Sequence, residues 1–255
     1  MLSKHITNVI QNLEKKKYRD KYNLFKVEGE KLVEELLRSD LETDTLVATS
    51  EWRAAHEELV GGRRVAEATR EEMARVSNFQ SPPEVLALAR IPAPADPPDN
   101  IRDTLSLLLN GIQDPGNMGT ILRVCDWFGV RAVFCDDDCA GVHNPKTVQA
   151  SMGAVFRIKV FRTHLPALIA GHVGPEFPCY GTFLRGDNIY HADLSPRGFV
   201  VMGNEGNGIS PEIEKLVSRR LTIPSFAGNG RSAESLNVGV ATGIVLSEFK
   251  RSLSV

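Results

Sequence analysis

Two apolar runs in the last third of the chain, each followed by a loop of small residues, constrain the fold more than any other feature. Phe199–Met202 leads into the glycine-rich stretch Gly203–Ser210, and Leu221–Pro224 leads into Ser225–Glu234. Glycine lets a ligand approach bare backbone, because it has no side chain to block the contact. Two such loops at adjacent strand ends form one crevice, the usual place for a nucleotide-like ligand in an open α/β sheet.

The residues before these loops have the pattern of a βαβ unit. Leu105–Asn110 is a continuous apolar run, typical of a central parallel strand. We expect a tight loop over Gly111–Gly119, a helix over Thr120–Phe128 that stops at Gly129, and a strand over Ala132–Phe134. Further strands are expected over 155–161, 178–182 and 199–202, and helices over 144–152, 165–170, 211–218 and 235–251. This alternation predicts an α/β domain with a mostly parallel sheet.

The first ninety or so residues predict a smaller α/β domain. Helices are expected over 6–16, 28–38, 50–59 and 70–76, the last with a capping box of Thr69 and Glu72. Strands are expected over 45–48, 64–66 and 85–89, and a short strand or a turn over 25–28. Four prolines then stiffen the backbone, at positions 92, 94, 97 and 98. We therefore assign residues 1–91 to a first domain, 92–103 to a linker and 104–255 to a second domain.

Composition limits the function classes. The chain has 255 residues, 24% of them charged and 42% hydrophobic, as in an ordinary globular protein. No apolar run approaches the roughly 20 residues of a membrane span, so no membrane partner is expected. The four cysteines fit a reducing compartment, the cytoplasm, better than a disulfide framework. Cys135 and Cys139 lie near His143, but no second ligand pair has the spacing of structural zinc, and we expect no metal.

One basic cluster departs from the net charge of −2. It consists of Lys15, Lys16, Lys17 and Arg19 around an aromatic residue, Tyr18, and Lys26 follows. Basic side chains with an aromatic among them can bind the phosphates of a nucleic acid. The cluster alone leaves a second interpretation open, a solvated helix end.

Three stretches at strand-to-loop junctions of the second domain carry polar side chains that could bind a ligand or take part in catalysis. Residues 110–123 hold Asn117 and Arg123, whose guanidinium fork suits phosphate. Residues 203–210 hold Glu205, and residues 223–237 form the third stretch. None of them is a dinucleotide fingerprint, a P-loop or a nucleophile elbow. In particular, Pro115 and Asn117 argue against a nicotinamide-dependent oxidoreductase. The residues by themselves indicate a nucleotide-like ligand at a sheet crevice.

In content and order these stretches resemble the three motifs of the SpoU/TrmH family, RNA ribose 2′-O-methyltransferases of the SPOUT superfamily. The matching residues are NGIQDPGNMGTILR at 110–123, VMGNEGNGIS at 201–210, and Ile223-Pro224 with SLNVGVATG at 235–243. The resemblance spans about 105–249, and residues 25–89 are similar to the family's N-terminal substrate-binding domain. It implies a C-terminal trefoil knot, S-adenosylmethionine as methyl donor, and a homodimer with the active site beside its interface.

The resemblance also implies roles for single residues. Donor-binding candidates are Gly203, Ile223 and Leu236, with Thr182, Gly206 and Asn237 in addition. Catalytic candidates are Arg123, Asn117, Glu205 and Ser235. A guanidinium with a pKa above about 12 is a poor base. Arg123 is therefore expected to clamp a phosphate and stabilise the developing alkoxide, with Asn117 positioning the ribose and Arg123. The proton is expected to leave to solvent or through Ser235.

Some alternatives stay open. Glu205 either faces the substrate or holds its own loop, and Ser235 either acts in catalysis or caps the last helix. The loop before Ser235 is longer than the family's usual one, so Ser232 is an alternative polar partner, and Gly239 stands where serine is common. We expect an enzyme acting on structured RNA, ribosomal or transfer. The alternative is a knotted RNA-binding protein for ribosome assembly without turnover.

Overall fold

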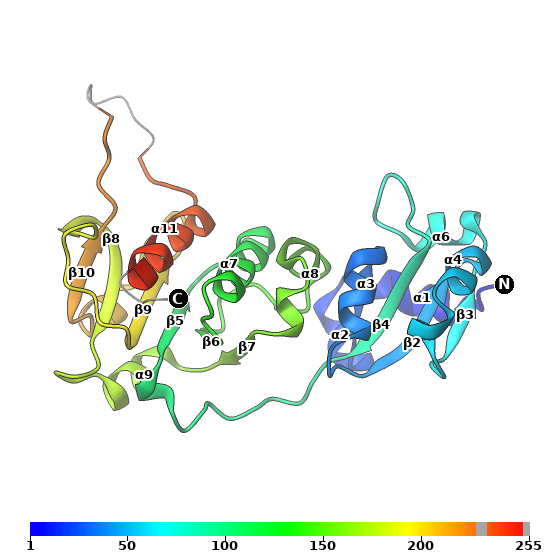
Figure 1. Ribbon diagram of the computed structural model, residues 1–255, viewed down its shortest axis with the longest axis horizontal. Helices are drawn as coiled ribbons and strands as arrows, with labels where there is room; N and C mark the ends of the chain where they lie inside the picture. Colours follow the sequence, from blue (N-terminus) through cyan, green and yellow to red (C-terminus); the bar gives the residue numbers. More distant parts are fainter. Residues whose placement is uncertain (228–233, 252–255) are drawn as a thin grey trace. The chain divides into compact units, whose positions relative to one another are not determined.

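The computed structural model describes residues 1–227 and 234–251. The chain forms two compact units (Figure 1). The first consists of Met1–Ala93 together with Gly141–Arg157, and the second of Pro94–Ala140 together with Ile158–Val255. The short segment 141–157 thus packs with the first unit, although its position in the sequence predicts that it belongs to the second domain.

The first unit is built on a mixed four-stranded sheet in the order β1-β4-β2-β3. β1 (Leu24–Glu28) and β2 (Thr43–Ala48) pair antiparallel with β4 (Val85–Arg90), and β3 (Val65–Glu67) pairs parallel with β2. Its helices are α1 (Lys4–Asn12), α2 (Lys16–Tyr22), α3 (Glu30–Leu37), α4 (Ser50–Ala55), α5 (Glu57–Val60), α6 (Arg70–Val76), α8 (Pro145–Ser151) and the 3₁₀ helix η2 (Ala154–Phe156). Buried apolar side chains of α1 and α6 pack on strands β2 and β4.

Local sequence signals in this unit have mixed outcomes. The predicted capping box of Thr69 and Glu72 is present at the start of α6, and the helix predicted from residue 144 is α8, capped by Asn144. The helix expected from Ser50 to Leu59 is wrong in detail, because Thr49 caps it and the helix breaks at His56. The helix expected over 6–16 ends at Asn12, and the lysines belong to a separate helix, α2.

The second unit contains a six-stranded sheet in the order β10-β8-β9-β5-β6-β7, with parallel pairing throughout. This confirms the predicted mostly parallel sheet. The strands are β5 (Leu105–Asn110), β6 (Ala132–Cys135), β7 (Lys159–Arg162), β8 (Cys179–Asn188), β9 (Gly198–Gly203) and β10 (Arg219–Thr222). The helices are η1 (Ile101–Asp103), α7 (Pro115–Trp127), α9 (Leu165–His172), α10 (Pro211–Glu214) and α11 (Val238–Arg251).

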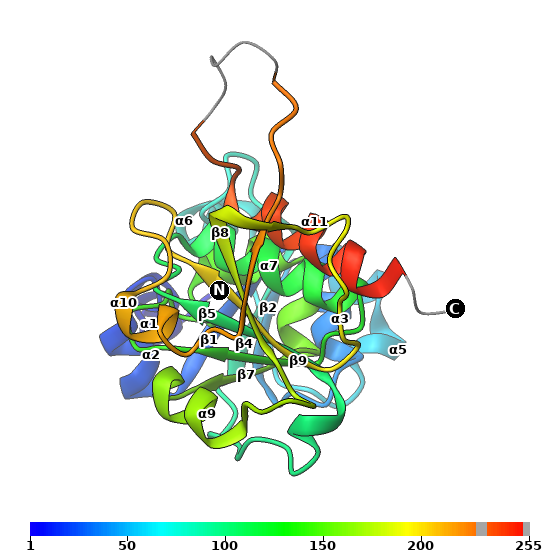
Figure 2. The same ribbon diagram turned by 90° about the vertical axis from the view of Figure 1, so that its left-hand side faces the viewer.

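Helices cover both faces of this sheet. α9 and α10 contribute to a core with Phe134, Phe199 and Val201. α11 runs beside α7 (Figure 2), and its Phe249 contacts the ring of Tyr180 on β8 at a centroid distance of 4.9 Å. The helix pair α7 and α11 therefore brings residues far apart in sequence to one place.

Some boundaries differ from those predicted for the second domain. α7 begins at Pro115 rather than Thr120, because Asp114 caps it and proline suits the first helical position. The strand expected over 155–161 is divided into η2 and β7. α11 begins at Val238, three residues later than expected.

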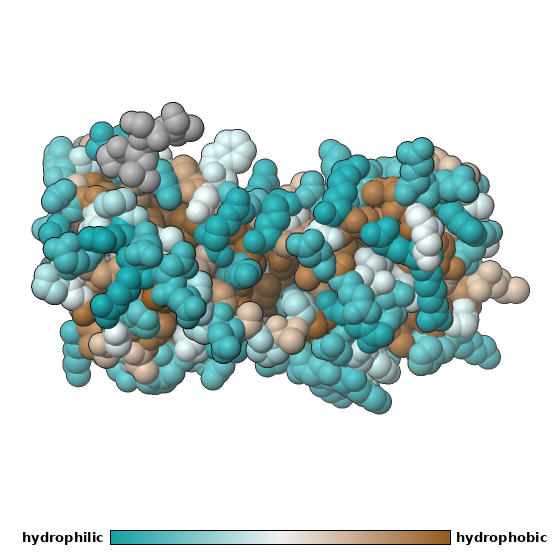
Figure 3. All heavy atoms as spheres, turned by 60° about the horizontal axis from the view of Figure 1, so that its bottom comes forward, coloured by the Kyte–Doolittle hydropathy of each residue, from teal (hydrophilic) through white to brown (hydrophobic). Residues whose placement is uncertain are grey.

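The surface in Figure 3 is mainly hydrophilic, and apolar residues show in smaller areas between the polar ones. Most large apolar side chains of the described residues are buried in the cores. Within residues 1–227 and 234–251, no helix has the length and apolar character needed to cross a membrane.

Candidate active site

The predicted motifs meet at one edge of the parallel sheet. β5 ends at Asn110, whose register partner on β9 is Gly203, the last residue of that strand. Thr182 follows the last residue of β8 that pairs with β9, and Ile223 follows the end of β10. Parallel strands have their carboxyl ends on the same side, where ligands bind in open α/β sheets.

The loop after β9 is folded tightly on itself. Asn204 and Gly208 exchange both backbone hydrogen bonds at 2.9 Å, and the Asn204 side-chain oxygen accepts the N–H groups of Gly206 and Asn207. A Cβ atom on Gly203 would lie 2.4 Å from the carbonyl carbon of Gly208, so only glycine fits there. This turn leaves Glu205 exposed at the strand end.

Three side chains, one from each motif, form a continuous hydrogen-bonded chain. Asn117 Nδ2 donates to Glu205 Oε1 at 2.7 Å, and Asn237 Nδ2 donates to Asn117 Oδ1 at 2.8 Å. A carboxylate only accepts, so Glu205 fixes the orientation of the Asn117 amide, and Asn117 then fixes that of Asn237. We call Glu205, Asn117 and Asn237 the amide chain. Glu205 thus holds a neighbouring motif rather than the backbone of its own loop.

The first motif is positioned by the start of α7. Asp114 accepts the Asn117 N–H at 2.7 Å and places Asn117 in the first helical turn. Arg123 is exposed on the same helix, and among the described residues its guanidinium makes no hydrogen bond or ion pair. At 3.6 residues per turn the two side chains lie about 120° apart around the helix. The structure therefore brings Asn117 to Glu205 and Asn237, and shows no contact between Asn117 and Arg123.

The third motif corrects one expectation. Asn237, not Ser235, caps α11, because its Oδ1 accepts the N–H groups of Gly239 at 2.9 Å and Val240 at 3.3 Å. Ser235 is exposed and has no hydrogen-bond partner in the part of the chain that the structure describes. A Cβ on Gly239 would lie 2.8 Å from Thr120 Cγ2, which explains why serine is absent at this close approach of α11 to α7. Ser232 lies outside the described residues.

The donor-binding candidates lie around the same edge. Thr182 is half-buried and donates to the Val201 carbonyl at 2.9 Å; Ile223 is half-buried too. A Cβ on Gly206 meets no close neighbour, so glycine is not sterically required there. Large apolar side chains stay exposed near this edge, namely Leu184 on β8 at 75%, and Phe226 and Leu236 in the loops at 84% and 49%. Apolar groups beside glycine backbone fit a ligand that carries an adenine ring and an aliphatic chain with a sulfonium.

Some residues of the basic cluster in the first unit are exposed and others are buried. Lys15, Lys16 and Lys17 are exposed at the start of α2. Arg19 is 6% exposed, and its guanidinium donates to the carbonyls of Leu13 and Glu14. The expectation that Arg19 offers a free surface charge is therefore not met.

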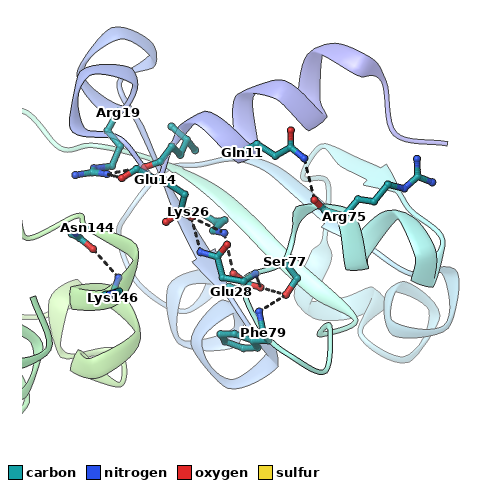
Figure 4. A network of polar contacts seen from close by, with 12 residues as sticks. Gln11, Glu14, Arg19, Lys26, Glu28, Arg75, Ser77, Phe79, Asn144 and Lys146 are labelled. Atoms are coloured by element: carbon teal, nitrogen blue, oxygen red, sulfur yellow. Dashed lines mark hydrogen bonds and ion pairs between the residues drawn. The ribbon is translucent and has the colours of Figure 1, made fainter.

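Lys26 is likewise buried rather than exposed. It is 2% exposed, and its ammonium lies 3.1 Å from both Glu14 and Glu28 (Figure 4). Glu28 in turn accepts the N–H of Asn78 at 2.9 Å. A buried ammonium between two carboxylates serves the fold, since removing one partner would leave a charge uncompensated.

Known proteins with similar sequences identify the family. The sequence model of the SpoU rRNA Methylase family matches residues 104–247, more than half of the chain. The chain belongs to this family. Residues 6–87 match the MRM3-like substrate binding domain.

Relatives cover both units. The 23S rRNA (guanosine(2553)-2′-O)-methyltransferase RlmP of Bacillus subtilis is 31% identical over 238 residues, 92% of each chain. A solved structure of a putative RNA methyltransferase of the TrmH family from Porphyromonas gingivalis has a TM-score of 0.85 at 39% identity, covering 98% of this chain and 99% of that one. The SpoU methyltransferase AviRb from Streptomyces viridochromogenes, solved in complex with AdoMet, has a TM-score of 0.84 at 26% identity, with 98% of both chains covered.

Family and fold together define the activity. The protein is an S-adenosylmethionine-dependent RNA ribose 2′-O-methyltransferase with an N-terminal substrate-binding domain. The three motifs of the sequence contain all three members of the amide chain, but no sequence pattern predicts the hydrogen bonds between them.

Proposed function

We propose that this enzyme methylates a ribose 2′-hydroxyl in ribosomal RNA. The support is the near full-length similarity to a relative named as a 23S rRNA methyltransferase. One observation within the chain carries the proposal, the amide chain that joins Asn117, Glu205 and Asn237 at the glycine-rich edge of the sheet. Such a fixed polar constellation suits the placing of a reacting hydroxyl, because reaction rates depend on orientation.

The donor is proposed to lie among the loops after β8, β9 and β10. When bound, S-adenosylmethionine supplies an electrophilic methyl group. Gly203 and Gly206 would contact it through backbone, Ile223 and Leu236 through apolar surface, and Thr182 from the neighbouring strand. Asn237 belongs near the donor through its place at the start of α11.

Arg123 is proposed as the residue that acts on the substrate. Its guanidinium is exposed and has no partner among residues 1–227 and 234–251, so it is available to an RNA phosphate. Arginine stays protonated and serves as a clamp and as a stabiliser of the developing alkoxide. Asn117 and Glu205 would position the ribose, and the proton would leave to solvent or through the exposed Ser235.

RNA docking is proposed for the first domain. We keep its boundaries at 1–91, with a linker over 92–103 and the catalytic domain over 104–255, as the two family matches support. Lys15, Lys16 and Lys17 form the docking cluster, since they are exposed together on one helix. Arg19 and Lys26 are left out because their charges are satisfied internally.

A knotted homodimer is also proposed, with α7 and α11 at the interface. Trp127 on α7 is 85% exposed and Val240 on α11 is 53% exposed, and exposed apolar side chains on two neighbouring helices favour a protein–protein contact there. Trp127 lies four residues after Arg123, on the same helix face, so a dimer there would place Arg123 beside the interface. The knot rests on the family resemblance. The cytoplasm is proposed as the compartment, since all four cysteines are free thiols.

The dimer has a direct test. Trp127→Glu is expected to shift the protein from dimer to monomer in sedimentation experiments, with Met152→Glu, another exposed apolar position, leaving it a dimer. A monomeric wild-type protein would remove the homodimer from the proposal.

The decisive experiment on function is a map of ribose methylation in cellular RNA. A strain lacking the protein should lose methylation at one ribosomal RNA ribose, and wild-type protein but not Arg123→Ala should restore it. Loss at a transfer RNA ribose instead would overturn the substrate class. Donor binding with no methyl lost from any RNA would favour the non-catalytic assembly factor.

A further inference from the structure

Asp136, which lies outside all three motifs, is bonded to the first of them. It follows the last residue of β6, and its carboxylate accepts Asn110 Nδ2 at 2.7 Å and the N–H of Gly111 at 2.9 Å. Among the described residues the Asp136 carboxylate makes no ion pair. Its hydrogen-bonding capacity is therefore directed at the dipeptide Asn110-Gly111, at the end of β5.

The same dipeptide holds the loop after β9. Asn110 Oδ1 accepts the N–H of Ser210 at 2.7 Å, and the Gly111 carbonyl accepts Asn204 Nδ2 at 2.7 Å. The two contacts lie at the two ends of the loop that carries Glu205. Asp136 and this loop thus lie on opposite sides of Asn110-Gly111 and are connected through it.

The direction of these hydrogen bonds follows from the carboxylate. Asp136 only accepts, so the Asn110 amide must present its NH₂ group to Asp136 and its oxygen to Ser210. With the amide reversed, two oxygens would face each other at Asp136 and two N–H donors at Ser210. Gly111 adopts φ +70°, a conformation that favours glycine, and its N–H is held by the same carboxylate.

We propose that Asp136 is a positioning residue for the donor-binding loop 203–210, acting through Asn110. The proposal rests on the assignment of that loop to S-adenosylmethionine. The carboxylate orients the Asn110 amide, and the amide then holds the start of α10 at Ser210 while Gly111 holds Asn204. The loop carries the donor candidates Gly203 and Gly206 and also Glu205, so moving it should lower donor affinity first and kcat only as far as Glu205 moves with it.

The turn around Asp136 has other supports, so loss of the carboxylate leaves the strand end folded. The N–H of Ile112 donates to Cys139 Sγ at 3.2 Å, and Ala140 donates to the Ile112 carbonyl at 2.8 Å. The Arg162 guanidinium binds the Asp136 backbone carbonyl. These contacts do not involve the Asp136 side chain and persist in a side-chain variant.

The test is a reciprocal exchange of the two side chains. Asp136→Asn places an NH₂ group against the donors of Asn110 or Gly111, and Asn110→Asp places two carboxylates face to face. In the double variant the amide now at position 136 donates to the carboxylate now at position 110 and accepts from Gly111. That carboxylate also accepts from Ser210, so every hydrogen bond is remade. Asp137→Asn is the matched control, since Asp137 is the neighbour of Asp136 in sequence and 94% exposed.

The readout is calorimetric affinity for S-adenosylmethionine, together with methyl transfer at saturating donor. Each single variant should raise the donor Kd about tenfold, because it replaces one hydrogen bond by a contact between two donors or two acceptors. The donor Kd of the double variant should return to within about threefold of wild type. In the single variants kcat should fall by a smaller factor than donor affinity does, and the RNA KM should change little.

Three results would overturn the inference. They are unchanged donor affinity in both single variants, a double variant as weak as the singles, and a loss confined to kcat. Wild-type protein that binds no S-adenosylmethionine would instead bring down the donor assignment, and the inference with it.

Discussion

Replacing Asn237 by Asp or Ala separates its two roles in the structure. Its Oδ1 caps α11 and its Nδ2 continues the amide chain to Asn117. Aspartate keeps the oxygen that caps the helix, and a negative charge is favourable at a helix N-terminus. It replaces the donor, however, with an oxygen that faces the oxygen of Asn117. Alanine removes both groups and leaves the Asn117 oxygen to water.

The alanine variant should lose more thermal stability than the aspartate variant, whereas the aspartate variant should lose more activity. Loss of the cap costs about 1 kcal/mol, and loss of one exposed hydrogen bond about 0.5 kcal/mol. Asn237→Ala should therefore lower the melting temperature by about 3–6 °C for a domain of this size. Asn237→Asp should stay within about 2–4 °C of wild type, because the favourable charge at the helix N-terminus offsets part of the cost of the opposed oxygens. Its opposed oxygens, at about 1–2 kcal/mol, should lower kcat/KM about 5- to 30-fold, more than alanine does.

Calorimetric melting and methyl transfer from labelled donor to RNA measure the two quantities on the same preparations. The expected signature is an inverted order, with the alanine variant less stable but more active than the aspartate variant. If both properties fall together in both variants, Asn237 acts only through the stability of α11, and the amide chain has no part in catalysis.

Three further predictions follow from the same structure. Arg123→Ala should reduce methyl transfer more than about a hundredfold while donor affinity stays within twofold; undiminished turnover would refute its role. Lys16→Glu with Lys17→Glu should weaken RNA binding and reduce the salt slope by about 1.5, and an unchanged slope would exclude these lysines from the interface. Burial, and less so the nearby Arg19, lowers the pKa of His143 to about 4. A lowered histidine pKa gives stability that is complete above about pH 6.5 and lost as the pH falls toward 4. In wild type, His143 should lower the free energy of unfolding in urea by about 2 kcal/mol between pH 7 and pH 4.5, and this part of the decrease should be absent in His143→Phe. An equal decrease in both proteins would contradict the prediction.

The fold of the second unit was largely readable from sequence because its signals are local. The continuous apolar run Leu105–Asn110 predicts a parallel strand, and it lies between two parallel neighbours. The start of α7 was misplaced because the glycines at 116 and 119 argued for a loop, while Asp114-Pro115 is a strong helix start. The cap at Asp114 and the packing of α7 against α11 together outweigh the low helix propensity of the two glycines.

The sequence predicts which residues belong to the candidate site but not the hydrogen bonds that join them. The sequence named Asn117, Glu205 and Asn237 from separate motifs, and nothing in their spacing states that their side chains bond to one another. Lys26 and Arg19 were predicted to be exposed because they lie in or near a basic cluster, and both are buried. Their carboxylate and carbonyl partners, such as Glu28 and Leu13, are decided only by tertiary packing.

The amide chain and the Asp136 contact use the same physical device, and this explains why asparagine recurs at the strand ends. An asparagine amide has a donor at one end and an acceptor at the other, so fixing one end with a carboxylate fixes the other. Glu205 does this for Asn117, and Asp136 does it for Asn110. Both carboxylates are thereby engaged with amides rather than with arginine. Within residues 1–227 and 234–251 neither carboxylate pairs with Arg123, which leaves its positive charge available for the phosphate contact that we propose.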